Sequence, residues 1–222
     1  MAKKFDTVVD LDELESRKQG DRQFVTALAR GLEVLRVFRP EDGPLGNQEL
    51  AERTGLPKPT VSRITHTLTT LGYLEYIPRL SRYAIAPAVL SLGHQCVTTA
   101  GIKRAARPHM QELAEYADAS VALGARDRLS MIYLDVARGS KTVAFSLDAG
   151  AHVPMRNSAM GAAFLWALPE QEREFLLDAI AKSHADEWPA IKRRLKAAFK
   201  SLDADGFCIF EGTYERAING VG

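Results

Sequence analysis

The clearest pattern of apolar and polar positions along the chain lies between Asn47 and Gly72. Leu50 and Ala51 give the first part of this stretch one apolar face, and Gly55 follows, where a residue without Cβ lets the chain turn. A second apolar stripe, at spacings of three, four and three residues, is formed by Val61, Ile64, Leu68 and Leu71. This spacing is typical of one helix face, so the stretch is predicted to be two short helices joined by a tight turn.

The opposite face of the second helix carries short polar groups and cations, namely Lys58, Thr60, Ser62, Arg63, His66 and Thr67. Such side chains reach phosphates and base edges in the major groove. There is no acid between Glu52 and Glu75, whereas a helix that is merely solvated normally mixes both signs. The pattern predicts a helix-turn-helix whose second helix reads DNA, with Gln48 on the first helix as a further contact. An ordinary helical hairpin with a polar face is the alternative.

The segments on either side of this hairpin extend the prediction. A supporting helix that ends by Pro40 is indicated by apolar residues at helical spacing: Val25, Leu28, Leu32, Leu35 and Phe38. After Gly72 the period changes to that of a strand, in Leu74, Tyr76, Tyr83 and Ile85. Arg79 and Arg82 lie where the tip of such a hairpin would meet phosphates or the minor groove. A basic hairpin directly after a helix-turn-helix predicts a winged helix-turn-helix, mainly α with a β-hairpin wing.

The rest of the chain predicts a second unit of mixed α+β type. The expected organisation is a mobile tail at 1–21, the winged DNA-binding domain at 22–87, a linker helix at 88–101 and the α+β domain at 102–222. Within the last, the expected elements are a helix at 102–116, strands at 120–126, 131–137 and 142–148, helices at 158–167, 170–183 and 187–202, and a strand at 207–210. The first of these helices should bury Ile102, Ala106, Met110, Leu113 and Ala117.

Composition and charge agree with this organisation. The 222 residues are 46% hydrophobic, enough for two modest domains or one large one. The net charge is only +1, but residues 22–97 carry nine Lys and Arg against six Asp and Glu, whereas residues 1–21 carry four against six. The positive excess lies with the helix-turn-helix, as binding to DNA requires. No apolar run approaches the roughly 18 residues of a membrane span, so a cytoplasmic protein without a membrane partner is expected.

Neither enzymatic nor metal chemistry is indicated by the sequence. Cys96 and Cys208 form no CxxC pattern, which argues against structural zinc and a disulfide scaffold. Ser158 lies in no GxSxG motif. No HxH or HExxH spacing occurs among the histidines, which are His66, His94, His109, His152 and His184. The prediction is therefore no catalytic residue, no metal and no cofactor. A winged helix used only for protein contacts is the alternative function, and a small-molecule enzyme is the least supported.

A second concentration of chemistry lies at residues 155–161, MRNSAMG. Asn157 or Ser158 can cap a helix that begins there, and the N–H groups of its first turn would attract an anion such as a carboxylate. Met155 and Met160 would supply adaptable apolar walls. Arg156 would pair with the anion only if it pointed inward, and an isolated Arg is expected to point outward. A plain N-cap beside core methionines is the alternative.

The motifs together resemble the IclR (isocitrate lyase regulator) family of transcriptional regulators. ARGLEVL at 29–35 resembles the family's first helix, GLPKPTVSR at 55–63 its recognition helix, and LGYL at 71–74 its entry to the wing. In the second domain, VPM at 153–155, SAMGAA at 158–163 and DGF at 205–207 resemble the effector domain. The resemblance covers about residues 24–222. It implies a GAF-like effector domain, a homodimer or tetramer, and promoter control by a small metabolite.

The resemblance also implies an effector pocket at the positions matching Met155, Ala159, Met160, Ile218 and Gly220, to which the capping argument adds Asn157, Ser158 and Gly161. Two departures from the family pattern stand out. Pro59 replaces the frequent Ser or Thr, and because the residue before a proline disfavours the α region, the recognition helix is expected to begin only at Pro59. Family members usually continue beyond Gly222 into further strands and a closing helix, so the effector domain is expected to be incomplete.

The expected function is that of a transcriptional regulator whose binding to a double-stranded DNA operator is controlled by a small carboxylate effector, from a catabolic pathway. The operator sequence, the sign of regulation and the identity of the effector do not follow from the sequence.

Overall fold

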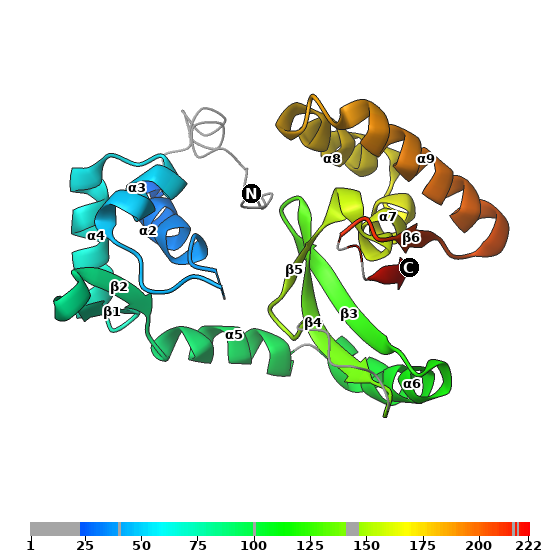
Figure 1. Cartoon of the computed structure of the whole chain (residues 1–222), viewed down its shortest axis with the longest axis horizontal. Helices are drawn as coiled ribbons and strands as arrows, with labels where there is room; N and C mark the ends of the chain where they lie inside the picture. The colour runs from blue at the N-terminus through cyan, green and yellow to red at the C-terminus, as the bar shows by residue number, and fades with distance from the viewer. Residues whose placement is uncertain (1–22, 40, 100, 141–146, 215, 217) are drawn as a thin grey trace. The chain divides into compact units, whose positions relative to one another are not determined.

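The computed structural model describes residues 23–39, 41–99, 101–140, 147–214, 216 and 218–222 (Figure 1). Within these ranges the chain forms two compact units, one reaching to Thr99 and the other following it. Each unit has a hydrophobic core of its own. The predicted tail at 1–21 and most of the strand predicted at 142–148 lie outside the described residues.

The N-terminal unit is a helical core with a hairpin on one side and a further helix after it (Figure 1). Its elements are α2 (Thr26–Arg36), α3 (Asn47–Thr54), α4 (Lys58–Thr70), β1 (Leu74–Ile77), the 3-10 turn η1 (Pro78–Leu80), β2 (Arg82–Ile85) and α5 (Ala88–Thr99). β1 and β2 pair antiparallel, with Tyr76 opposite Tyr83, and Leu45 bridges to Tyr83 on the outer side of β2. This is the winged helix-turn-helix that the sequence predicted.

The turn between α3 and α4 forms for the expected reason, but α4 begins earlier than expected. Gly55 ends α3 with a φ of 71°, in the left-handed region that a residue without Cβ adopts most easily. α4 begins at Lys58, not at Pro59. Pro57, in an extended conformation, is the N-cap residue, and Pro59 falls in the first turn, where a missing N–H is harmless. The bias of Lys58 against the α region is therefore overridden.

The core of this unit uses a different face of α2 from the predicted one. Val34 and Val37 are buried, whereas Val25, Leu28 and Leu32 are 60%, 62% and 51% exposed. Leu35 and Phe38 pack against the core from its edge, as expected. Apolar residues lie on two adjacent sides of α2, so helical spacing alone does not decide which side packs on α3 and α4.

The apolar stripe of α4 is confirmed except at its end. Val61 and Leu68 are buried and Ile64 packs against them, but Leu71 is 62% exposed. α4 ends at Thr70, so Leu71 leaves the helical stripe, and Leu74 at the start of β1 enters the core instead.

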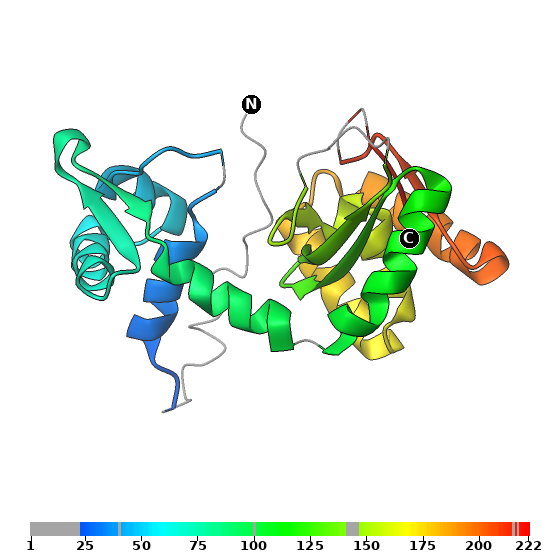
Figure 2. The ribbon, with the colours of Figure 1, turned by 90° about the horizontal axis from the view of Figure 1, so that it is seen from below.

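The C-terminal unit is of the α+β type that the sequence predicted (Figure 2). Its elements are α6 (Gly101–Ala117), β3 (Ser120–Asp127), β4 (Ser130–Arg138), β5 (His152–Pro154), the 3-10 turn η2 (Met155–Asn157), α7 (Ala159–Ala167), α8 (Glu170–Ser183), α9 (Trp188–Asp205), β6 (Ile209–Glu211) and β7 (Asn219–Val221). β3, β4 and β5 form an antiparallel sheet in that order, and β6 pairs antiparallel with β7. The pattern of the sequence did not predict β5 or β7, each only three residues long.

α6 lies along β3 and β4 on a face that matches the predicted one only in part (Figure 2). Of the predicted stripe, Ala106 and Met110 pack there as expected. Met110 and Ala114 pack on Ala137, whereas Ile102 and Leu113 are 61% and 52% exposed. Arg107 Nη1 donates to Asp135 Oδ1 at 2.9 Å and Lys103 Nζ lies 3.7 Å from the same oxygen, so this face of α6 carries ion pairs to the sheet beside its apolar contacts.

α7 runs through the main core of the C-terminal unit. It is apolar on all sides, as expected of a helix surrounded by protein, and it packs on α9, on α8 and on β7. The core around it includes Met131, Met155, Leu165, Ile180, Ile191, Leu195, Leu202, Cys208 and Phe210. The start of α7 is therefore held rigidly by elements from distant parts of the sequence.

Candidate DNA-binding face and effector site

Six of the residues predicted to contact DNA lie on one face of α4. Lys58, Ser62, Arg63, His66 and Thr67 are exposed, and Thr60 is partly buried. This face is opposite the side that carries Val61 and Leu68 into the core. Thr67 Oγ1 donates to the carbonyl of Arg63 at 2.9 Å, one turn earlier. Gln48, exposed on α3, donates to Glu52 in the same helix. The face is thus cationic and polar, and the core behind it fixes its direction.

Thr65 is a positioning residue that the sequence did not single out. Its side chain is fully buried, and its Oγ1 lies 3.1 Å from Asn47 Oδ1 and 3.1 Å from the carbonyl oxygen of Ser62. Because Asn47 begins α3, this contact fixes the recognition helix against its partner helix. In the sequence, Thr65 resembles the other polar residues of α4. Its position, four residues after Val61 and three before Leu68, places it on the buried stripe and could have identified it.

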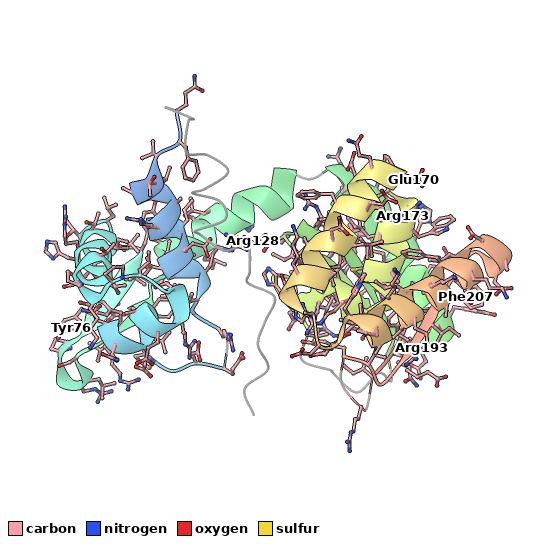
Figure 3. All side chains as sticks on the ribbon, turned by 90° about the horizontal axis from the view of Figure 1, so that it is seen from above. Tyr76, Arg128, Glu170, Arg173, Arg193 and Phe207 are labelled. Atoms are coloured by element: carbon pink, nitrogen blue, oxygen red, sulfur yellow. The ribbon has the colours of Figure 1, made fainter. Side chains whose placement is uncertain are left out.

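Of the cations predicted on the wing, Arg82 is held by the protein itself and Arg79 is exposed. Arg82 Nη1 donates to the carbonyl of Pro44 at 2.8 Å and lies 3.0 Å from Glu49 Oε2. Glu49 in turn accepts from the N–H of Gly46 at 2.9 Å, before the start of α3. Arg82 therefore ties the wing to the helix-turn-helix. The Tyr76 and Tyr83 rings lie 5.0 Å apart across the hairpin. Figure 3 labels Tyr76 on the wing.

An ion pair joins the loop after α2 to α3. Arg53 Nη2 donates to Asp42 Oδ1 at 2.8 Å, and Arg53 Nη1 donates to the carbonyl of Val37 at 3.0 Å. The hydrogen bond from Arg53 lowers the pKa of the Asp42 carboxyl below its ordinary value. The pair therefore stays ionised at neutral pH and stabilises the loop that leads into the helix-turn-helix.

Ser158 is the N-cap of α7, as the sequence allowed. Its Oγ accepts from the N–H of Gly161 at 3.1 Å and donates to the carbonyl of Pro154 at 3.0 Å. Asn157, the other candidate cap, instead accepts from Arg194 through its side chain and from Thr213 Oγ1 at 2.9 Å through its carbonyl. Met155 is fully buried in the core. The start of α7 is thus fixed by contacts from β5, α9 and the segment after β6.

Ala159, Met160 and Gly220 come together at this helix start. Met160 lies over β3 at Gly124, because a Cβ added to Gly124 would stand only 2.3 Å from Met160 Sδ. The pairing register between β3 and β4 shifts at the same place. A Cβ on Gly220 would stand 3.7 Å from Ala159 Cβ, in ordinary contact. Ile218, partly buried, accepts from the N–H of Gly212 at 2.9 Å and so belongs to the β6–β7 pairing.

Arg156 does not point outward, as an isolated arginine was expected to. It is only 8% exposed. It lines a cavity of about 500 Å³ between η2, the turn that joins α8 to α9, and the segment after β6. Met160, Ile218 and Gly220 are not among the residues that line this cavity. Arg156 therefore faces this cavity, whereas Met160 lies at the start of α7 against β3.

The part of the chain that the structure describes holds no group of three or more His, Cys, Asp or Glu side chains placed to bind a metal ion. None of its helices is long and apolar enough to cross a membrane. Cys208 is a free, buried thiol whose pKa is raised by that burial, and its Sγ lies 3.7 Å from the carbonyl oxygen of Ala159. The side chain of Cys96 lies outside the described residues.

Comparison with known proteins identifies the class of molecule to which these features belong. The profile of the IclR helix-turn-helix domain matches residues 27–78, and that of the bacterial transcriptional regulator IclR C-terminal domain matches residues 94–221. The chain is a DNA-binding transcriptional regulator with an N-terminal helix-turn-helix and a C-terminal α+β effector domain. It belongs to the IclR family.

Individual relatives agree with this assignment. The HTH-type transcriptional regulator TsaQ1/TsaQ2 of Comamonas testosteroni is 38% identical over 212 residues, which are 95% of this chain and 75% of the relative. The crystal structure of an IclR family regulator from Brucella abortus has a TM-score of 0.85 at 46% identity, covering 92% of this chain and 77% of that one. An IclR homologue from Microbacterium hydrocarbonoxydans, solved in complex with 4-hydroxybenzoate, shares the fold (TM-score 0.62, 18% identity, 88% and 81% covered).

Proposed function

We propose that a small organic carboxylate, bound at the first turn of α7, controls the binding of the N-terminal unit to an operator. The proposal rests on the contacts at the start of α7. Ser158 caps this helix start, Met160 lies against Gly124 of β3, and Gly220 lies beside Ala159. In this proposal residues 22–87 bind DNA, residues 88–101 form a linker helix, and residues 102–222 bind the effector. The protein would act in the bacterial cytoplasm.

The chemistry of a helix start favours an anion at this place. The N–H groups of Ala159 and Met160 precede the first intrahelical hydrogen bonds of α7, and the cap at Ser158 serves Gly161. The partial positive charge of the helix start adds about 0.3–1 kcal/mol for an anion near the surface, and up to about 2 kcal/mol in a partly buried geometry. The apolar side of the ligand would lie against Met160, which Met155 supports from within the core, while Asn157 and Ile218 would complete the surroundings.

The first test fills this site. We expect Met160→Trp to abolish the response of DNA affinity to the effector, because the indole is larger than the thioether chain and Met160 already lies against Gly124. A panel of small keto acids and aromatic acids, including 4-hydroxybenzoate, would be titrated by calorimetry, and operator affinity would be measured by fluorescence anisotropy with and without each acid.

The matched control is Tyr116→Trp, which places the same side chain at a position 89% exposed in the same unit. It should leave the acid response within about twofold of the wild type, since fully exposed substitutions rarely change a distant site. If an acid altered operator affinity equally in both variants, the effector would bind elsewhere.

The DNA contacts in the proposal come from α3, the α4 face and the wing, and they include the partly buried Thr60 and Arg82: Gln48, Lys58, Thr60, Ser62, Arg63, His66, Thr67, Arg79 and Arg82. We propose that the protein binds DNA as a homodimer, with a tetramer as a further assembly. A single winged unit with a small charge excess covers little duplex, and two-fold pairing doubles its contacts. Footprinting should show a pseudo-palindrome with half-sites about one helical turn apart, or a multiple of it. Protection of one half-site by a monomer would contradict this.

A further inference from the structure

The helices α8 and α9 form an outer layer of the C-terminal unit. They are joined by the short turn at 184–187, and the structure describes every residue of 170–205. The Arg173 guanidinium lies over the Phe199 ring, 5.8 Å from its centroid, so the two helices lie side by side and run antiparallel. Figure 3 shows this layer from above, with Glu170 labelled on α8 and Arg193 on α9.

Each of these helices buries one apolar side against the core around α7. Leu176 and Ile180 of α8 are buried, as are Ile191, Leu195 and Leu202 of α9. The opposite side of each helix therefore faces solvent. On these two exposed sides the charges are separated by sign.

The exposed side of α8 is acidic. Glu170, Glu174 and Asp178 recur at intervals of four residues, and all three are exposed. Within α8, which is described throughout, Lys182 next to the turn is the only exposed Lys or Arg. Spacing of four residues places the three carboxylates on one stripe along the helix.

The exposed side of α9 is basic. Its exposed cations are Lys192, Arg193, Lys196 and Lys200. The first acid of α9 is Asp203, and this residue already accepts from the Trp166 indole N–H at 2.8 Å. A stripe that is merely solvated normally alternates in sign, whereas here each helix carries one sign along most of its length.

The acidic and basic stripes are complementary to those of a second copy of the chain. A two-fold axis parallel to the helices, above the surface and midway between them, places α8 of each copy over α9 of the other. This rotation keeps each residue at its own level along the helices. Since Arg173 is level with Phe199, Asp178, five residues nearer the turn, lies opposite the neighbourhood of Arg193 of the partner subunit.

The same register brings the remaining charges into opposition. Glu174 lies opposite the stretch between Lys196 and Lys200 of the partner subunit, and Glu170 lies beyond Lys200. Each opposed pair occurs twice, because the interface is isologous. From this arrangement we propose that the α8–α9 surface is an interface between the C-terminal units of two copies of this chain. The proposal does not depend on the binding of DNA or of an effector, and its failure would leave the proposed function intact.

The size and chemistry of this surface determine the kind of association. The 14 residues of α8 span about 20 Å, and two adjacent helices are about 20 Å wide. Such a surface is at the small end of specific interfaces. Exposed ion pairs are individually weak and are screened by salt. The pairing is therefore expected to be weak and to weaken further as the salt concentration rises.

Reversal of charge on either helix should break this pairing. Sedimentation equilibrium of the full chain without DNA would compare the wild type with Glu174→Lys/Asp178→Lys and with Arg193→Glu/Lys196→Glu. Each double variant should associate about tenfold more weakly than the wild type at low salt, because like charges then face each other. Circular dichroism would establish that both variants are folded.

A recovery of association provides a test that misfolding cannot imitate. The α8 variant has two basic stripes and the α9 variant two acidic ones, so an equimolar mixture of the two should associate about as strongly as the wild type. The chain carrying all four reversals exchanges the two stripes and keeps the wild-type net charge. It should therefore also associate like the wild type.

The matched control is Glu112→Lys/Glu115→Lys, which makes the same change in net charge at exposed positions of α6. It should change self-association by less than about twofold. The proposal would be overturned by a wild type that does not self-associate at low salt, by a control as weak as the α8 variant, or by no recovery in the mixture and in the fourfold variant. If the α9 variant lost affinity for random duplex DNA but kept its self-association, the basic stripe would instead be a contact for nucleic acid.

Discussion

Replacing Gly161 with alanine is expected to destabilise the C-terminal unit by about 3 kcal/mol or more, at the upper end of overpacking effects. A Cβ at this position would stand 2.3 Å from the carbonyl oxygen of Met155 and 2.5 Å from Met155 Cα. Both are backbone atoms of a fully buried residue in η2, so no rotation of a side chain can relieve the overlap. α7 would have to move away from η2, and its contacts with α9 and β7 would loosen with it.

Urea unfolding followed by tryptophan fluorescence would measure this effect. Both tryptophans of the chain, Trp166 and Trp188, belong to the C-terminal unit, so the signal reports that unit alone. The control is Gly101→Ala in α6, where a Cβ would meet nothing within 4 Å. Alanine favours a helix more than glycine does, so this variant should be unchanged or stabilised by up to about 1 kcal/mol. Similar free energies of unfolding for the two variants would show that the contact between Gly161 and Met155 is not rigid.

The helix-turn-helix could be predicted from the sequence because its determinants are local. The turn residue Gly55, the α4 stripe and the change of period at the wing lie within one short stretch. The predictions that were wrong or incomplete in this unit concerned packing between helices. Whether Leu28 or Val34 of α2 faces the core is decided by α3 and α4, and Thr65 is distinguished from its polar neighbours only by its contact with Asn47.

The effector unit was predicted less completely because its sites join distant segments. Helix positions followed from periodicity, but strands of three residues such as β5 and β7 have too few positions to show a period. The capping role of Ser158 is local and was foreseen. The burial of Arg156 was not, because the α8–α9 turn and Thr213, which line the same cavity, lie far away in the sequence. An arginine beside a cap motif carries no signal of its own burial.

On the DNA side, Arg63 and Arg79 are expected to have separable effects, because one lies on the recognition helix and the other on the tip of the wing. Arg63→Ala should weaken binding to the operator by about 1–3 kcal/mol and relax the base preference, as expected for loss of a contact to base edges. Arg79→Ala should weaken binding to all sequences similarly and reduce the slope of affinity against salt concentration by about one unit, as expected for loss of a phosphate contact. The operator for both measurements would be selected from a random pool of duplexes.

The control for charge is Arg104→Ala, which removes a cation from an exposed position on α6 in the other unit. It should leave both the affinity and the salt slope unchanged, because the proposal gives contacts with DNA to the N-terminal unit alone. Arg82 needs separate treatment: its contacts with Pro44 and Glu49 hold the wing in place, so Arg82→Ala would change both wing geometry and charge. If Arg63→Ala and Arg79→Ala each weakened operator and random DNA to the same extent, α4 would not be the element that reads the sequence.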